Sequence, residues 1–207
     1  MAKALGLART SAARWDGSHA GRTVVLLKTG VGAKNTADTL TGLAPKDYGI
    51  TISAGLCGSM NPLAKSGDIV ADAREADLDL VKPLRETALA MAAPFHFGKI
   101  LHTNIVLQPK AKKALGEEQR AVACDMESQA VRRWADGKTE TLAVRVVLDE
   151  MNEACPTETP ENETFNAQLK FALTHMTQLP LLIKTVWRAS RGMKTLSTFI
   201  TKYLETL

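Results

Sequence analysis

The sequence lacks the features that mark secreted, membrane-spanning and metal-binding proteins. Its three cysteines, Cys57, Cys124 and Cys155, are odd in number and widely spaced. They fit neither a disulfide framework nor a zinc site, so we expect a reducing, cytoplasmic compartment. No apolar run approaches the ~20 residues of a membrane-spanning helix, and none near the N-terminus resembles a signal peptide. The four histidines do not cluster with cysteines or acids at ligand spacings, so we expect no metal.

Neither sign of charge is in large excess. The 26 basic and 22 acidic side chains give a net charge of +4, which permits anionic partners but does not require nucleic acid, and we expect none. With 45% hydrophobic and 23% charged residues, the composition is that of an ordinary soluble globular chain. A length of 207 residues suffices for one well-covered domain. We therefore expect a single domain over residues 1–207, with residues 181–207 as a helical tail.

Strand and helix patterns alternate along the chain. Strand regions are expected at residues 23–28, 48–54, 66–72, 97–107, 120–124 and 141–148, and helices at 33–43, 79–91 (after Pro83), 109–115 and 165–179. Residues 4–8 resemble the tail of a short strand, residues 9–20 lack a clear period, and residues 151–164 resemble a loop. This order predicts a layered α/β fold, with a mixed, twisted β-sheet flanked by helices.

The stretch from residue 121 to residue 150 carries the most chemistry. Asp125 occupies an expected helix N-cap, and Glu127 adds a second acid to the first turn, which suits the helix dipole. The apolar, β-branched run at 142–148 is typical of a strand covered on both faces, and it ends on Asp149. We expect Glu127 and Asp149 at the carboxyl ends of neighbouring strands, where open α/β sheets bind ligands. The same acids are also ordinary at helix caps and loop starts, so the pattern alone leaves both interpretations open.

Two glycine-containing strand ends are further candidates for a binding site. Gly30 and Gly32 lie between a strand and a helix, an arrangement whose free backbone N–H groups suit an anion. Gly55 follows the next strand, where glycine lets a backbone approach a ligand closely. In both places glycine is equally what a tight turn or a bend requires.

Taken together and in order, four segments resemble the nucleoside phosphorylase superfamily, which includes purine nucleoside phosphorylases and methylthioadenosine/adenosylhomocysteine nucleosidases. The segments are Leu26–Gly32, Ile52–Met60 with Gly67–Val70, Asp125–Ser128 and Val144–Asp149. The tail, from Gln178 through Leu196, resembles the hopanoid-associated phosphorylase branch, which is linked to the removal of adenine from adenosylhopane.

The resemblance implies roles for individual side chains. Asp149 matches the acid near N7 of the base, which needs a raised pKa to hold a proton at neutral pH. Glu127 matches the residue that accepts hydrogen bonds from the ribose 2′- and 3′-hydroxyls, and Met126 matches the residue that packs on the sugar. Asn104 falls near the base-binding segment. Leu148 stands where the family usually has a serine before the acid.

The departures from the family pattern concern the nucleophile. The resemblance places Gly30, Gly32 and Gly55 beside an anion or nucleophile. Residues 6–8 match the end of the family's first strand, but Arg9 stands where the nucleosidases have an acid that positions water. Arg9 is a candidate for holding phosphate and, equally, an ordinary surface arginine. Ser53 stands where phosphorylases commonly have a phosphate-binding arginine.

The function that the resemblance favours is cleavage of the N-glycosidic bond of an adenine nucleoside, as in the step from adenosylhopane to ribosylhopane in hopanoid biosynthesis. Phosphate would be a co-substrate, and no cofactor is expected. We expect the protein to form a homo-oligomer. Two alternatives stay open: hydrolysis, as in the nucleosidases, and a nucleoside-binding protein without turnover.

The tail itself has two interpretations. Its apolar residues recur at spacings of three and four, and Lys184, Arg188 and Arg191 form a basic stripe on another face. Such a helix can rest on the inner face of a membrane, or it can pack its apolar stripe on the sheet. Gly192 weakens a continuous helix by about 1 kcal/mol, so two shorter helices are an alternative.

Overall fold

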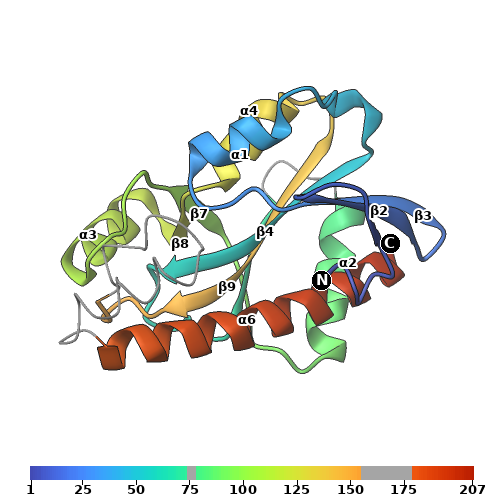
Figure 1. Ribbon diagram of the computed structural model, residues 1–207. Coiled ribbons are helices and arrows are strands. Elements are labelled where there is room, and N and C mark those ends of the chain that lie inside the picture. Colours follow the sequence, from blue (N-terminus) through green and yellow to red (C-terminus); the bar gives the residue numbers. More distant parts are fainter. Residues whose placement is uncertain (74–77, 155–178) are drawn as a thin grey trace.

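The computed structural model describes residues 1–73, 78–154 and 179–207 (Figure 1). Most of the expected loop at 151–164 and of the expected helix at 165–179 therefore lies outside the described residues. Within the described ranges, no helix is long and apolar enough to cross a bilayer.

A six-stranded mixed sheet, in the order β6-β5-β9-β4-β8-β7, forms the centre of the structure. Its strands are β4 (Ile50–Ser59), β5 (Ile69–Asp72), β6 (Phe95–Phe97), β7 (Lys99–His102), β8 (Ala121–Asp125) and β9 (Glu140–Asp149). β4 and β9 run parallel along nearly their whole length, whereas β8 joins β4 antiparallel only at Gly58 and Ser59. Every residue from 141 to 147 is buried, as expected for a strand covered on both faces. The predicted α/β fold with a mixed sheet is confirmed.

A separate three-stranded antiparallel sheet contains β1 (Ala8–Arg9), β2 (Arg14–His19) and β3 (Arg22–Leu27). The turn between β2 and β3 has positive φ at both of its central residues, 48° at Ala20 and 78° at Gly21. The sequence pattern did not reveal β2, because its residues are mostly polar and only partly buried. Of residues 4–8, which were expected to be the tail of a short strand, Ala8 alone is in a strand, namely β1, and in the described part of the chain β1 pairs with β2.

Helices cover both faces of the central sheet (Figure 1). They are α1 (Ala33–Leu40), α2 (Leu78–Ala90), α3 (Pro109–Gln119), α4 (Ser128–Ala135) and α6 (Leu179–Thr206), with a 3₁₀ turn at Pro45–Asp47. α1 and α4 lie together on one side, whereas α6 and α2 contact each other on the opposite side. The largest core cluster joins α6 to the sheet, with Phe199 and Tyr203 packed beside Val144 and Val146.

Several sequence predictions need correction. The expected strand at 97–107 is two short strands, β6 and β7, and the second ends at His102. Pro83 lies inside α2 rather than before its regular part. Asp125 ends β8, and the N-cap of α4 is Glu127. The strands that carry the two acids are not neighbours, because β4 lies between β8 and β9.

The tail is one continuous helix that passes through Gly192. A Cβ at position 192 would lie 2.9 Å from Cγ1 of Val146, so glycine is what lets α6 approach β9 closely here. The C-terminal half of α6 belongs to the core, as Leu196 and Phe199 are fully buried. The N-terminal half instead exposes large apolar side chains, among them Trp187.

Candidate active site

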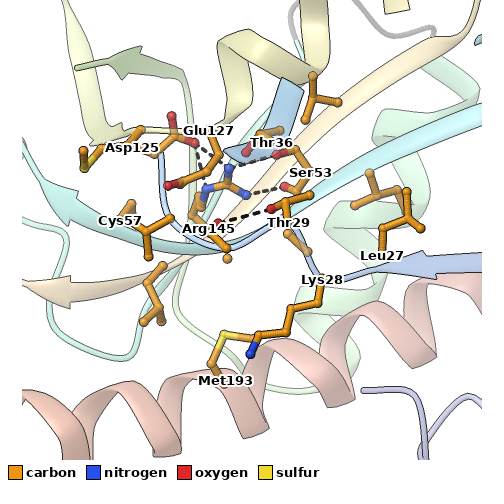
Figure 2. A pocket seen from close by; sticks show the side chains of 18 of the residues that line it. Leu27, Lys28, Thr29, Thr36, Ser53, Cys57, Asp125, Glu127, Arg145 and Met193 are labelled. Carbon is orange, nitrogen blue, oxygen red and sulfur yellow. Dashed lines mark hydrogen bonds and ion pairs between the residues drawn. The ribbon is translucent and has the colours of Figure 1, made fainter. Parts of the chain in front are cut away.

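A cavity of about 950 Å³ lies beside the β4 and β9 ends, and its walls are mostly apolar (Figure 2). The other walls come from β3 and the loop after it, from α1 and α4, and from residues in the range 103–107. Five of the predicted site residues line this cavity: Gly30, Gly55, Met126, Glu127 and Asp149. The fold thus brings together side chains from positions more than a hundred residues apart in the sequence.

Asp149 reaches the cavity from the last position of β9. Its carboxylate lies over Gly58 of β4, where an added Cβ would lie 3.1 Å from Oδ2 and 3.5 Å from Oδ1. The side chain is 14% exposed. Burial raises the pKa of Asp149 above its usual range, and the ammonium of Lys112 opposes part of that rise. The acid therefore has the environment that favours a bound proton.

Lys112 is the partner of Asp149, and the sequence did not identify it. Its side chain is 1% exposed, and Nζ forms an ion pair with Oδ2 of Asp149. Nζ also donates to the carbonyl oxygens of Glu150 and Glu153, each at 3.0 Å. α3 sits close enough for this contact because Gly116 packs on Met60, whose carbonyl oxygen would be 2.8 Å from a Cβ at position 116.

A second buried ion pair forms part of the cavity wall. Arg145 of β9 is 1% exposed, and its Nε and Nη2 donate to Oδ2 of Asp125 at 2.8 and 2.6 Å. The other donors go to Ser53, through its carbonyl oxygen and its hydroxyl (Nη2–Oγ 2.9 Å), and to the carbonyl of Val144. All five N–H groups of this guanidinium are therefore engaged by the protein itself. Figure 2 shows the network, with Ser53 and Asp125 on either side of the arginine.

Glu127 connects α4 to the glycine-containing loop after β3. Its Oε1 accepts a 2.7 Å hydrogen bond from the backbone N–H of Gly32. Gly32 does not line the cavity itself, but it holds this carboxylate in place. Glu127 occupies the N-cap position of α4 but makes no side-chain capping bond. Asp125, two residues earlier, accepts from the N–H and the hydroxyl of Ser128 at the start of the helix. Within the described ranges, Oε2 of Glu127 has no hydrogen-bond partner, so it can accept from a ligand.

Besides Gly32, the structure leaves two predicted residues, Arg9 and Asn104, outside the cavity lining. Arg9 is exposed, donates to the carbonyl oxygens of Ser11 and Ala12, and lies 5.7 Å from the ring centroid of Trp15. Asn104 is also exposed and pairs with His102 in the bend after β7. Its neighbours at positions 103 and 105 line the cavity in its place.

Lys28 was not singled out from the sequence, yet it lines the cavity at the end of β3. Figure 2 shows its side chain directed toward Met193 of α6, which also lines the cavity. Lys28 thus adds a cationic side chain to the cavity lining, directed toward α6. The sequence feature that could have identified Lys28 is its position at the end of the strand predicted at 23–28, just before the glycine-containing turn.

The basic stripe predicted for the tail is divided in the structure. Lys184 and Arg188 both bind the carboxylate of Glu153, at 2.6 and 2.5 Å. Partial burial raises the pKa of Glu153, but its hydrogen bonds to these two residues outweigh burial and lower the pKa to about 2. Arg191 stacks on Trp187, 5.4 Å from the ring centroid. Two of the three residues in the predicted stripe therefore tie α6 to the loop after β9, and the third stacks on its own helix.

Comparisons with known proteins found one sequence relative and a set of solved structures with a similar fold. No protein-family model matches the chain. The chain is 28% identical over 174 residues to a DeoD-type purine nucleoside phosphorylase from Colwellia psychrerythraea, covering 72% of this chain and 74% of that protein.

Solved structures give the same fold at lower sequence identity. The methylthioadenosine/adenosylhomocysteine nucleosidase of Neisseria meningitidis has a TM-score of 0.70 at 14% identity, covering 100% of this chain and 96% of that one. The corresponding nucleosidase of S. pneumoniae reaches 0.73 at 16% identity, covering 97% and 89%. Futalosine hydrolase of Helicobacter pylori reaches 0.70 at 14% identity, covering 97% and 88%.

Proposed function

We propose that the chain is a member of the superfamily of purine nucleoside phosphorylases and methylthioadenosine/adenosylhomocysteine nucleosidases, and that it releases adenine from an adenine nucleoside. The observation that carries this proposal is the pair of carboxylates, Asp149 and Glu127, which line one cavity from different elements. One carboxyl group is suited to protonate the base, and the other is suited to bind the sugar.

Protonation of the base is the role proposed for Asp149. An adenine anion is a poor leaving group, so the glycosidic bond breaks readily only when the base takes up a proton, here at N7. Burial raises the pKa of the Asp149 carboxyl group, which favours the protonated form that a general acid needs. Positioned general acids of this kind accelerate reactions by about 10²–10⁴-fold.

Binding of the ribose is the role proposed for Glu127 and Met126. The sugar develops positive charge as the base leaves, and a fixed carboxylate stabilises that charge. Glu127 is fixed by its hydrogen bond to Gly32, and its second oxygen is available for the 2′- and 3′-hydroxyls. Met126 lines the same cavity and offers a soft, apolar contact to the sugar face.

Phosphate is the proposed nucleophile. The site proposed for it lies between the backbone near Gly30 and Gly55 and the side chain of Lys28, all of which line the cavity. Arg145 does not serve in this site, because its donors are already engaged. Hydrolysis is the second candidate, favoured by the position of Arg9 outside the cavity, which leaves fewer cations to hold phosphate.

The 5′ substituent of the proposed substrate is large and apolar, as in adenosylhopane. The cavity, about 950 Å³, lies at the upper end of the ~300–1,000 Å³ of small-molecule sites. Its lining includes Val31, Ile105 and Met193, which are apolar yet exposed, and so an apolar group can extend outward past them. Release of adenine from adenosylhopane, giving ribosylhopane in hopanoid biosynthesis, fits this shape.

The test is adenine release from adenosines with 5′ substituents of increasing apolar size, measured with and without phosphate. We expect release to require phosphate and to become faster with the larger apolar substituents. Equal release without phosphate would assign hydrolysis instead. Adenosine binding with no release from any substrate would leave a nucleoside-binding protein.

A lipid-linked substrate also motivates the proposal of peripheral contact with the inner face of the membrane, whereas the proposal of a homo-oligomer rests on the family resemblance. The N-terminal half of α6 exposes Ile183, Val186 and Trp187, which are 62%, 68% and 60% exposed. Apolar side chains on a helix with basic residues favour an anionic lipid surface. Co-sedimentation with anionic and neutral vesicles at low salt tests the first proposal, and no pelleting with anionic vesicles would refute it. Light scattering of the purified chain tests the second.

A further inference from the structure

We propose that Lys112 is the positioning residue of the acid: its ammonium holds Oδ2 of Asp149 and leaves Oδ1 as the oxygen that carries the proton to the base. The inference deepens the proposed function and rests on it for the identity of the proton acceptor. The ion pair itself is a property of the folded protein. Nothing in the family resemblance assigns a role to Lys112.

The geometry determines which oxygen is available. Nζ of Lys112 has three protons and three acceptors, namely Asp149 Oδ2 and the carbonyl oxygens of Glu150 and Glu153. Because an oxygen that already accepts from an ammonium is a poor site for a second proton, the proton of the neutral acid belongs on Oδ1. The side-chain bond to the carboxylate goes to Oδ2, and no side chain donates to Oδ1 within residues 1–73, 78–154 and 179–207. Asp149 also lines the cavity where the base would bind.

Stability alone does not explain a lysine at this position. Removing an ammonium from water costs several kcal/mol, and buried ion pairs are often replaced by apolar residues of similar size at no loss of stability. Lys112 lies at a place where a methionine would fill the same space between α3 and the end of β9. A role in proton transfer explains why a charge is present there, because a general acid works best when its pKa lies near the operating pH.

Lys112 also opposes the effect of the other groups around Asp149, which raise the pKa of this acid. Burial raises the pKa of the carboxyl group, and the carboxylate of Glu153 raises it further. Among the groups around it, the neighbouring thiol of Cys124 is itself held protonated, with a pKa raised to about 12. Lys112 is the cation that lowers the pKa of Asp149, so the acid can give up its proton and recover it in each turnover.

The direct experiment follows the titration of Asp149 itself, independent of turnover. Protein labelled with ¹³C at the aspartate carboxyl carbons is titrated by NMR, and the Asp149 signal is assigned with Asp149→Asn. Lys112→Met removes the charge that favours the carboxylate, so the titration midpoint should rise by about 1–3 pH units, the usual effect of a close opposite charge. Lys112→Arg retains the charge and should keep the midpoint within about one unit of the wild-type value.

The matched control is Lys113→Met, because Lys113 is the next residue of α3 and is exposed. It should leave the midpoint unchanged. If Lys112→Met fails to fold by circular dichroism, Lys112→Gln removes the charge and keeps two N–H donors, and it should raise the midpoint in the same direction. A wild-type midpoint in a folded Lys112→Met or Lys112→Gln protein would overturn the inference.

Turnover then connects the pair to catalysis. A general acid works only while protonated, so adenine release falls as the pH rises through its pKa. With Lys112→Met the alkaline limb of the profile should move to higher pH together with the NMR midpoint, and kcat should fall more than KM changes. A moved NMR midpoint without adenine release from any nucleoside would refute the proposed function but not the pairing. If Lys112→Met still releases adenine but its alkaline limb stays at the wild-type pH, the role of Lys112 in positioning the acid would be refuted and the proposed function would stand.

Discussion

Replacement of Asp149 by asparagine should change both catalysis and stability, because we propose that the acid donates a proton to the base and it also pairs with Lys112. The asparagine side chain cannot donate a proton to N7 as an acid, so adenine release should fall by about 10²–10⁴-fold. At about 1.36 kcal/mol per factor of ten, this corresponds to roughly 3–5 kcal/mol of lost transition-state stabilisation.

The same substitution should also destabilise the fold. Lys112 is 1% exposed and would keep its charge without an opposite charge beside it. Complete loss of one partner of a buried pair costs about 3–5 kcal/mol. Here the asparagine carbonyl and the carbonyl oxygens of Glu150 and Glu153 still accept from Nζ. We therefore expect a smaller loss, about 1–3 kcal/mol in the free energy of unfolding.

A double-mutant cycle distinguishes the two effects. Adding Lys112→Met to Asp149→Asn removes the unpaired charge, so urea denaturation should show stability recovered toward the wild-type value. Adenine release should stay as slow as in Asp149→Asn alone. The control is Asp136→Asn, which changes an exposed acid paired only with Lys138 and should alter neither quantity. Wild-type turnover in Asp149→Asn would remove this residue from the mechanism, and a double variant less stable than Asp149→Asn would refute the pairing argument.

Three further predictions follow from other contacts. Glu127→Gln should slow cleavage of ribosides much more than of 2′-deoxyribosides, and equal losses on both would mean that the carboxylate only fixes the adjoining loop. Gly192→Ala should lower the free energy of unfolding by about 1 kcal/mol, because overpacking against Val146 costs ~1–3 kcal/mol and outweighs the ~1 kcal/mol gain in helix propensity; a more stable variant would contradict the close contact. Glu153→Gln should lower Tm by about 2–4 °C, the effect of roughly 1 kcal/mol. Since the folded pKa of Glu153 is lowered to about 2, that difference should be full above pH ~4.5 and vanish as the pH falls toward 2, and a constant difference across that range would refute it.

The sequence predicted the parts of the fold that depend on local pattern. The apolar run at 142–148 required burial on both faces, and β9 is buried in that way. The turn after β3 was predictable because Gly30 and Gly32 have φ values of 75° and 91°, a region that residues with a side chain rarely adopt, and α1 begins directly after Gly32. Glu127 and Asp149 were predicted to share a site, and they do line one cavity, although β4 separates their strands.

Long-range electrostatic contacts could not be predicted from the same pattern. Lys112 lies in a helix that also carries Lys110 and Lys113, and a basic helix of this kind is ordinarily solvent-facing. Its burial depends on the packing of Gly116 against Met60, which is distant in sequence. Likewise, the pairing of Glu153 with α6 required the loop after β9 to meet a helix thirty residues later.

The two buried ion pairs in the cavity wall, Asp125–Arg145 and Asp149–Lys112, differ in whether the acid keeps a carboxylate oxygen available to a ligand. Asp125 uses both carboxylate oxygens, one with Ser128 and the other with Arg145, and it is fully buried within its own network. It can therefore hold the wall together but has no oxygen left to exchange a proton with a ligand. Asp149 gives only Oδ2 to Lys112 and remains 14% exposed toward the cavity. This difference supports our proposal that the acid at the end of β9 is the proton donor and that the acid at the end of β8 is part of the scaffold.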